Sequence, residues 1–400
     1  MTSSTGVWPP PNPASPPVKP PETHSLGERA EVISEAALQP SFSRLSEQPD
    51  ASLALNVHLP FCPSRCLSCD RIAVVQHQPY ELEHYVANLA LELTRTAEML
   101  GERRTLARVH FGGGSPNHLS ELALATVFSH IGEHFAVDAS VQREIGRIHS
   151  LELLEDVISI AHGVNFASIG MDYLVGLPGQ TTDSCKQSME AILSLDPDWL
   201  VCLPFHRRES LFPHQIAVDS DHLPSLADRM VMFNQVQMDF TEAGYEWVGL
   251  NVFAKPDHPL AVAQRDGSLA LSVLGYGTET DLAVLGIGLG ALGELPGLVT
   301  QNETRLSAWH NQIETGVLSV ASAIRSDDSE TLQRMVMRNL MCRQSISVDS
   351  LTESQREKWI LPLTGQGYAE EDAGVYRLTE LGLTVLPHVW TDSSPAFRAF

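Results

Sequence analysis

A short loop carries three of the six cysteines in this 400-residue chain. It follows the apolar run 53–57, which has strand character, and places Cys62, Cys66 and Cys69 in a C-x3-C-x2-C pattern. Thiolates are soft ligands that suit iron–sulfur clusters or zinc. A closed structural metal site uses four protein ligands, whereas a site that does chemistry keeps one coordination position open. Three thiols at this spacing therefore predict a metal centre with an open position.

Zinc is the alternative metal. His58 lies shortly before Cys62 and would complete a tetrahedral set of ligands. The remaining cysteines, Cys185, Cys202 and Cys342, are isolated, and the sequence lacks the second closely spaced Cys or His pair that zinc sites usually have. We therefore expect the cysteine loop to bind an iron–sulfur cluster rather than zinc.

The chain is acidic, with 49 Asp and Glu residues against 26 Lys and Arg residues and a net charge of −23. Nucleic acids and anionic membranes attract basic surfaces, so we expect neither as a partner. The sequence shows no apolar run as long as a membrane span, and its start lacks the basic and apolar segments of a signal peptide. Cysteines that are reduced and unpaired fit a cytoplasmic protein.

The first 50 residues differ in composition from the rest. Eight prolines lie among residues 9–21. Such a segment favours extended, solvated conformations and cannot bury enough apolar surface to fold alone. We expect residues 1–50 to form a Pro-rich, largely disordered region, with a short helix near the end of the stretch 26–48.

Strand-like and helix-like segments alternate after the cysteine loop. This alternation predicts parallel βα units, and in barrels of such units the chemistry lies at the carboxyl ends of the strands. The cysteine loop and two glycine-containing turns, 112–116 and 176–181, all follow strands, so we expect them to share one rim. The expected strands are 106–111, 166–175 and 199–203, and the expected helices are 80–100, 120–135, 151–162 and 225–243.

Three consecutive glycines, Gly112, Gly113 and Gly114, follow the strand 106–111 directly. Glycine lets the backbone approach a ligand closely and leaves N–H groups available to bind it. Glycine-rich turns are common in proteins. This turn indicates a cofactor site mainly because the cysteine loop precedes it in the chain.

Several motifs of the chain resemble those of the oxygen-independent coproporphyrinogen III oxidases, which are radical S-adenosylmethionine (radical SAM) enzymes of haem biosynthesis with haem-chaperone relatives. The motifs are the cysteine loop, HFGGGSP at 110–116, DYLVGLPGQT at 172–181, FAKP at 253–256, LAVAQRDG at 260–267 and LGIGLGAL at 285–292. The resemblance covers about residues 50–390. It implies an α/β fold with a partial (βα) barrel over residues 51–300, and an oxidoreductase that converts porphyrinogen propionates to vinyl groups by oxidative decarboxylation.

The resemblance also implies the cofactors and the residues that hold them. Cys62, Cys66 and Cys69 would bind a [4Fe–4S] cluster, whose open iron chelates S-adenosylmethionine and breaks it to a 5′-deoxyadenosyl radical. Two molecules of S-adenosylmethionine are implied. The residues expected at the first are Asn56, where the family usually has an aromatic hydroxyl, Gly112, Arg147 and Asp172; those near the second are Gly113, His206 and Leu292, with Gly114 on the same glycine edge.

The expected substrate is a tetrapyrrole. Arg207 and Arg208 supply local positive charge that suits its carboxylates, although an exposed pair of charges is an equal alternative. The resemblance implies an electron donor such as flavodoxin or ferredoxin and a monomeric enzyme. Two other functions stay open: a haem-binding chaperone that keeps the cluster, and an inactive paralogue that keeps only the fold.

One segment of the family pattern is missing from this chain. Family members have one to two additional βα units between the positions of Ser140 and Val141, which bring an acidic strand and a glutamine to S-adenosylmethionine. Here the two residues are adjacent. Strands beside such a gap must pair again or leave backbone groups unpaired. We expect a shortened barrel with an open or unusually paired wall and impaired activity.

The last hundred residues, 301–400, are expected to form a separate small domain. A helical pattern covers 332–342, a hairpin pattern covers 367–379 and a further helical pattern covers 381–389. This order is similar to a winged helix. Because few of its residues are basic, we expect a packing or lid role rather than DNA binding.

Overall fold

The computed structural model describes residues 31–390, apart from 63–64, 67–68, 70–71, 76–77, 102–104, 115–118, 146–167, 208–212, 280–281 and 326–327. Only the backbone is described for 121, 137–145, 213, 328–335 and 387–390. The expected helix 151–162 and two predicted site residues, Arg147 and Arg208, lie outside the described residues.

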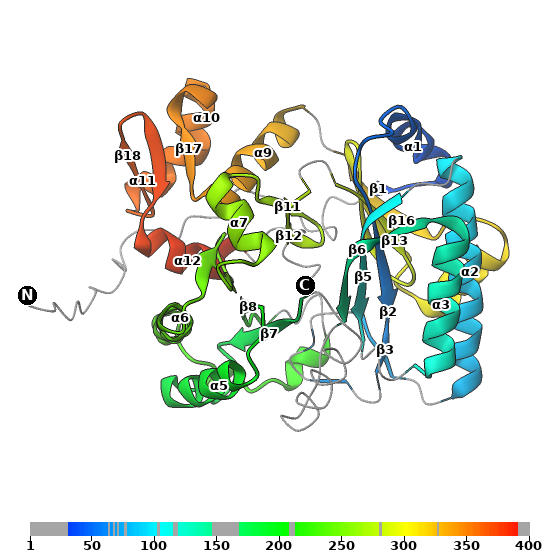
Figure 1. Cartoon of the computed structure of the whole chain (residues 1–400), viewed down its shortest axis with the longest axis horizontal. Helices are drawn as coiled ribbons and strands as arrows, with labels where there is room; N and C mark the ends of the chain where they lie inside the picture. Colours follow the sequence, from blue (N-terminus) through cyan, green and yellow to red (C-terminus); the bar gives the residue numbers. More distant parts are fainter. Residues whose placement is uncertain are drawn as a thin grey trace, which may run out of the picture.

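The larger of two main sheets has eight strands in the order β1-β16-β15-β14-β13-β2-β5-β6. Its central strands β13, β2, β5 and β6 are parallel, and the remaining strands pair antiparallel. Helices α2 and α3 cover one face of this sheet (Figure 1). The strands are β1 Glu31–Val32, β2 Leu53–Leu59, β5 Thr105–Gly113, β6 Ala136–Ile145, β13 Ala283–Ile287, β14 Leu292–Leu295, β15 Leu298–Asn302 and β16 Val320–Arg325; the helices are α2 Pro79–Leu100 and α3 Glu121–His134.

Local sequence explains these elements. In β2, every side chain but that of His58 is buried, as in the centre of a parallel sheet covered on both faces. Helix α2 buries one stripe that includes Tyr85, Leu89 and Leu93, and it ends at Gly101 in the left-handed conformation. The side chain of Ser120 accepts a hydrogen bond from Ala123 N–H and so caps the start of α3.

The second main sheet has four strands in the order β7-β8-β10-β9, of which β7 and β8 are parallel. Helices α5 and α6 pack against it, and their buried side chains form a separate apolar cluster with those of β7, β8 and β10 (Figure 1). The elements are β7 Gly170–Val175, β8 Trp199–Pro204, β9 Glu246–Val248, β10 Val252–Ala254, α5 Thr182–Ser194 and α6 Leu226–Glu242.

The Ser140–Val141 junction, where the sequence predicts a gap, lies inside strand β6. Strand β6 is the last described strand at its end of the first sheet, β7 is the last at its end of the second, and no described residues pair the two strands. Strand β6 is also irregular: Val137 pairs with Leu106, but Gln142 pairs with Arg108. Three extra residues of β6 are therefore accommodated around the Ser140–Val141 junction, and such a bulge disrupts the ladder locally.

The short helix expected near the end of 26–48 is α1 (Gln39–Ser46). Its Phe42 and Leu45 are buried in the core of the first sheet, so the expected limit at residue 50 does not separate this helix from the barrel. The barrel also does not end at residue 300, because β15 spans that position and β16 completes the sheet up to Arg325. Both corrections have one cause: apolar side chains outside the expected limits cover apolar surface of this sheet.

The C-terminal part has the order of elements that the sequence predicts. Strands β17, β19 and β18 form a three-stranded antiparallel sheet between α9 and α12. Its core is continuous with that of the second main sheet. Its elements are α9 Asp328–Arg343, β17 Ser345–Ser347, α10 Glu353–Gln355, α11 Leu361–Gly365, β18 Ala369–Asp372, β19 Val375–Leu378 and α12 Glu380–Trp390.

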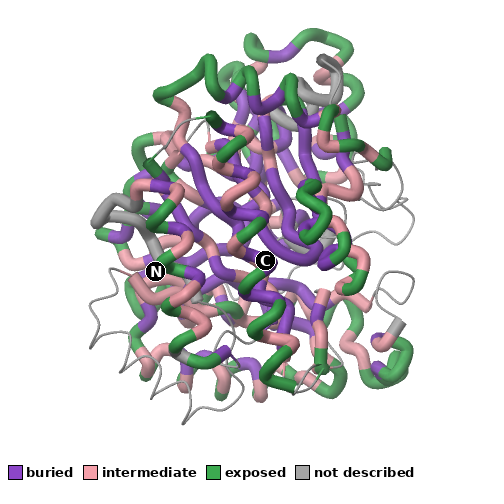
Figure 2. The backbone as a smooth tube through the Cα atoms, turned by 90° about the vertical axis from the view of Figure 1, so that its right-hand side faces the viewer, coloured by how far each residue is buried: buried purple, intermediate pink, exposed green. Residues whose placement is uncertain are grey.

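Smaller elements connect these layers: β3 Phe61–Cys62, β4 Val74–Val75, α7 Pro259–Asp266, β11 Ala270–Ser272, β12 Gly275–Gly277 and α8 Leu306–Glu314. The buried backbone runs through the centre of the molecule, and exposed segments surround it (Figure 2). Within the described part of the chain, every helix is too short or too polar to span a lipid bilayer.

Candidate cofactor site

The cysteine loop and the glycine edge lie side by side at the carboxyl ends of two neighbouring strands. Strands β2 and β5 are parallel and in register, with Leu59 opposite Gly113. Gly114 N–H donates to Leu59 C=O at 2.7 Å, and Cys62 follows three residues after Leu59. The two motifs that the sequence places on one rim are therefore in contact.

Two of the glycines are required by this contact. Gly113 has a φ of +109°, a conformation that residues with a side chain rarely adopt. A β-carbon on Gly113 would collide with the His58 imidazole, and one on Gly114 would collide with the Phe61 carbonyl oxygen. Glycine here lets the edge of β5 approach the backbone that leads into Cys62.

The cysteine loop is anchored at its far end by a segment that follows the second sheet. Cys69 N–H donates to Cys66 C=O at 3.1 Å, which forms a turn. Cys69 C=O is 2.8 Å from His214 Nε2 and accepts a hydrogen bond from Gln215 Nε2 at 3.0 Å. Both partners belong to a short helical turn, 213–217, and the Gln215 side chain is fully buried. The loop thus bridges the carboxyl edges of both sheets.

The three thiols of the loop are not tied up in disulfides, and the same holds for the other three cysteines. Cys62 and Cys66 are partly exposed, whereas Cys69 is buried.

Asn56 and Leu292, predicted for two different cofactor positions, are joined directly. The buried Asn56 amide donates to Leu292 C=O at 2.8 Å. Residues 236 positions apart are thereby brought to the same part of the first sheet. The Asn56 side chain thus holds β2 to the start of β14.

Asp172 lies in β7, opposite Val201 of β8, and is exposed. The turn that follows β7 is held by Gln180. Its Oε1 accepts from Gly176 N–H at 2.6 Å and from Leu177 N–H at 3.1 Å. Its Nε2 donates to Tyr173 Oη at 2.8 Å. The 176–181 motif is thus a self-bonded turn that ends β7.

His206 and Arg207 follow β8 at the same edge of the second sheet, where Phe205 N–H donates to Val175 C=O at 2.7 Å. Arg207 Nε donates to Gln215 C=O at 3.1 Å, and its Nη2 donates to Ile216 C=O at 3.2 Å. The Arg207 guanidinium therefore braces the turn that anchors Cys69, a role that the sequence analysis did not predict.

A network of hydrogen bonds that the sequence does not reveal lies behind the cysteine loop. Tyr85 Oη on α2 donates to His58 C=O at 2.7 Å and accepts from Leu289 N–H at 2.9 Å. The His58 Nδ1 contacts Leu289 C=O. The Tyr85 ring stacks on Trp309 at 4.6 Å. Helical spacing predicts that Tyr85 is buried but gives no signal of its polar partners.

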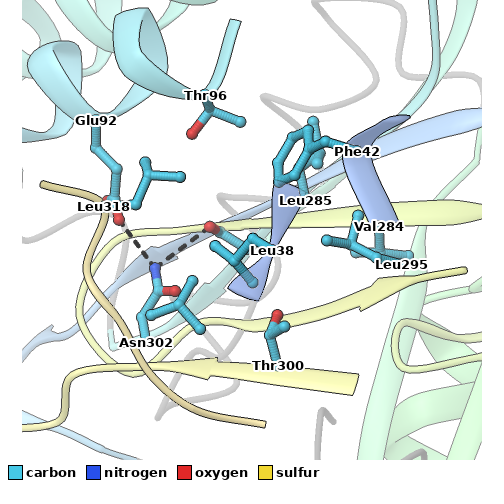
Figure 3. Close-up of a pocket in the computed structure, with 12 residues that line it drawn as sticks. Leu38, Phe42, Glu92, Thr96, Val284, Leu285, Leu295, Thr300, Asn302 and Leu318 are labelled. Atoms are coloured by element: carbon cyan, nitrogen blue, oxygen red, sulfur yellow. Dashed lines mark hydrogen bonds between the residues drawn. The ribbon is translucent and has the colours of Figure 1, made fainter. Parts of the chain in front are cut away.

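Glu92 is a buried carboxylate two turns further along α2. It accepts hydrogen bonds from Gly288 N–H at 2.6 Å, from Asn302 Nδ2 at 3.0 Å and from Ser319 Oγ. Figure 3 shows it beside a cavity of about 20 Å³, room for about one water molecule, between α1, α2 and the first sheet. Burial raises the pKa of Glu92 to about 7, against the lowering effect of the Ser319 and Gly288 hydrogen bonds.

Glu92 should make stability depend on pH. Because its pKa is about 7 in the folded state and about 4.5 ordinarily, the folded protein binds this proton more tightly. The contribution to the free energy of unfolding is complete below pH 4.5 and is lost as pH rises through 7, a change of about 3 kcal/mol. Glu92→Gln should remove this part of the pH dependence in denaturant unfolding between pH 5 and 8.

The control is Glu98→Gln on the same helix. The Glu98 side chain is 59% exposed and pairs with Arg95. If the two variants show the same pH dependence, the pKa of Glu92 is not raised in the folded protein.

Comparison with known proteins gives a consistent result. The chain is 26% identical to the oxygen-independent coproporphyrinogen III oxidase of Salmonella typhimurium, over 82% of this chain and 79% of that protein. It is 23% identical to the Escherichia coli protein of the same name, over 90% and 89%. A solved structure of the E. coli protein, described as a radical SAM enzyme, superposes with a TM-score of 0.79 and covers 90% of this chain. No protein-family model matches the chain.

The alignments also show that this chain is shorter internally. The E. coli match spans 410 aligned positions but uses 90% of 400 residues, about 360, so about 50 positions face no residue here. The Salmonella match spans 364 positions and uses 82%, about 328.

Proposed function

The chain is a relative of the oxygen-independent coproporphyrinogen III oxidases, and we propose that it is a radical SAM oxidoreductase of the same type, acting on porphyrinogen propionates in haem biosynthesis. The observation that carries the proposal is the contact between the cysteine loop and the glycine edge at the carboxyl ends of β2 and β5. In βα barrels, catalytic groups occupy that edge.

Different residues would hold the two cofactors. Cys62, Cys66 and Cys69 would hold a [4Fe–4S] cluster, and the N–H groups of the glycine edge would bind S-adenosylmethionine. When bound, the two groups supply a radical that removes one hydrogen atom from a propionate side chain. Gly114 and Gln215 keep the loop against both sheets, so the reacting groups meet in a fixed geometry.

Further positions complete the proposed first cofactor site and a second one. Asp172 and Arg147 would meet the ribose and the carboxylate of the first S-adenosylmethionine. His206 and Leu292 would lie near a second molecule. We expect Arg208 rather than Arg207 to meet substrate carboxylates, because Arg207 is engaged with backbone carbonyls. A flavodoxin or ferredoxin would supply the electron.

The expected gap supports a second candidate, an inactive paralogue that keeps the fold. Among the described residues, strands β6 and β7 are edges of separate sheets. The resemblance implies that the segment missing after Ser140 would bring an acidic side chain and a glutamine to the cofactor.

One assay separates the candidates. Protein reconstituted anaerobically with iron and sulfide is given a reductant, S-adenosylmethionine and coproporphyrinogen III. An oxidase releases 5′-deoxyadenosine and carbon dioxide and converts two propionates to vinyl groups, measured by mass spectrometry. An inactive paralogue binds the cluster and releases none of these. Haem that co-purifies with the protein, without decarboxylation, would identify a chaperone.

A further inference from the structure

We propose that the surface between α2 and α8 binds one divalent transition-metal ion of the zinc class, at a site separate from the cysteine loop. The ligands are Glu81 and His84 of α2 and His310 of α8. One ligand atom from each of these residues lies within 4.8 Å of the others. Each helix thus places a His on the same face of the helix pair.

Each histidine is oriented by a polar group on the opposite helix. His84 Nε2 is 2.7 Å from Glu314 Oε1, and His310 Nδ1 is 2.6 Å from the Asn88 amide nitrogen. Protein metal sites use this arrangement: one ring nitrogen binds the metal while the other is held by a carboxylate or amide. For Nε2 to bind an ion, the Asn88 amide must make a half-turn so that its oxygen accepts from Nδ1–H, which gives up the hydrogen bond that Asn88 Nδ2 donates to Glu314 Oε1 at 3.2 Å.

The second nitrogen of His310 is the observation that points to a ligand. His310 is 8% exposed, and among the described residues its Nε2 is buried without a hydrogen-bond partner. A buried polar atom left unpaired costs free energy that a bound ion would recover.

The donor set defines the ion. Two imidazoles, one carboxylate and a nearby second carboxylate, Glu314, suit zinc and similar ions better than magnesium or calcium. The His84 and His310 rings are stacked, parallel within 1° and with centroids 4.2 Å apart, so one ring must rotate for both nitrogens to point at one ion. An ion here would join α2 to α8 beside Tyr85 and Trp309, which support the strand leading to Cys62.

The test is zinc binding by calorimetry. The cluster-loaded protein is used so that iron occupies the three cysteines, and it should bind one Zn²⁺ per chain. His84→Ala, at a side chain 48% exposed, should weaken binding by at least about tenfold. Zinc should raise the melting temperature of the wild type but not of this variant. His130→Ala is the matched control, because His130 pairs with Glu133 on α3 at 3.2 Å.

A second protein keeps the test independent of the cluster. The variant with Cys62, Cys66 and Cys69 all replaced by serine should bind the same single Zn²⁺, and Glu81→Gln in it should weaken binding. Two results would overturn the site. One is cluster-loaded wild-type protein that binds no Zn²⁺. The other is a His84→Ala variant that binds Zn²⁺ as tightly as the His130→Ala variant does.

Discussion

Cys66→Ala is expected to abolish cluster assembly. After anaerobic reconstitution the wild type should show the broad brown absorption of a [4Fe–4S] centre, and the variant should show none. The reason is local: Cys66 contributes its carbonyl to the turn with Cys69 N–H, which alanine retains, so the substitution removes the thiolate alone. Two remaining thiolates cannot hold a cluster that needs three. Iron and sulfide analysis measures the result.

Cys342→Ala is the matched control. Cys342 is buried in the C-terminal core, where burial raises the pKa of its thiol to about 12. It therefore stays protonated at neutral pH and does not compete for iron. This variant should assemble the cluster normally. Equal iron and sulfide in Cys66→Ala and the wild type, or a single zinc ion without sulfide, would refute the assignment of the loop.

Restoring the missing segment is expected to restore cleavage of S-adenosylmethionine. We expect the chain to lack two polar contacts that the missing segment would make to the cofactor. Each is worth about 1–3 kcal/mol, so the loss of both should weaken binding by roughly 30- to 25,000-fold relative to relatives that have the segment. The unmodified chain should therefore convert little or no coproporphyrinogen III. Insertion of a relative's βα segment between Ser140 and Val141 should recover both binding and 5′-deoxyadenosine formation.

We expect the junction between Ser140 and Val141 to tolerate the inserted segment. Strand β6 is an edge strand whose register already shifts between Val137 and Gln142, so a new strand can pair there and fill the space toward β7. The control is a Gly/Ser segment of equal length, which lengthens the connection without supplying contacts. Turnover by the unmodified chain at the rate of full-length relatives would mean that the gap is harmless.

The order and type of most elements, and the meeting of the two main motifs, follow from sequence. A strand before the cysteine loop and a strand before Gly112 were expected to be parallel, and carboxyl ends of neighbouring parallel strands share an edge. The contact of Gly114 with Leu59 is the direct consequence. The junction of Ser140 and Val141 lies within β6, and the register of β6 against β5 is irregular there.

The domain limits depended on packing that no local pattern reports. Helical pattern predicts a helix near residue 45, but the burial of Phe42 and Leu45 depends on the first sheet, which they cover. The predicted boundary near residue 300 was wrong because hydrogen bonds between β15 and β16 continue the first sheet beyond that residue.

Polar partners were decided by tertiary structure alone. The sequence predicts that α2 has a buried face, but Glu92 on that face is stable only because Gly288 N–H, Asn302 and Ser319 lie opposite it. His84 and Glu314 are 230 positions apart and meet because α2 and α8 cross at that point. Periodicity specifies which side of a helix turns inward, whereas a hydrogen bond needs two atoms within about 3 Å, and only the packed fold sets that distance.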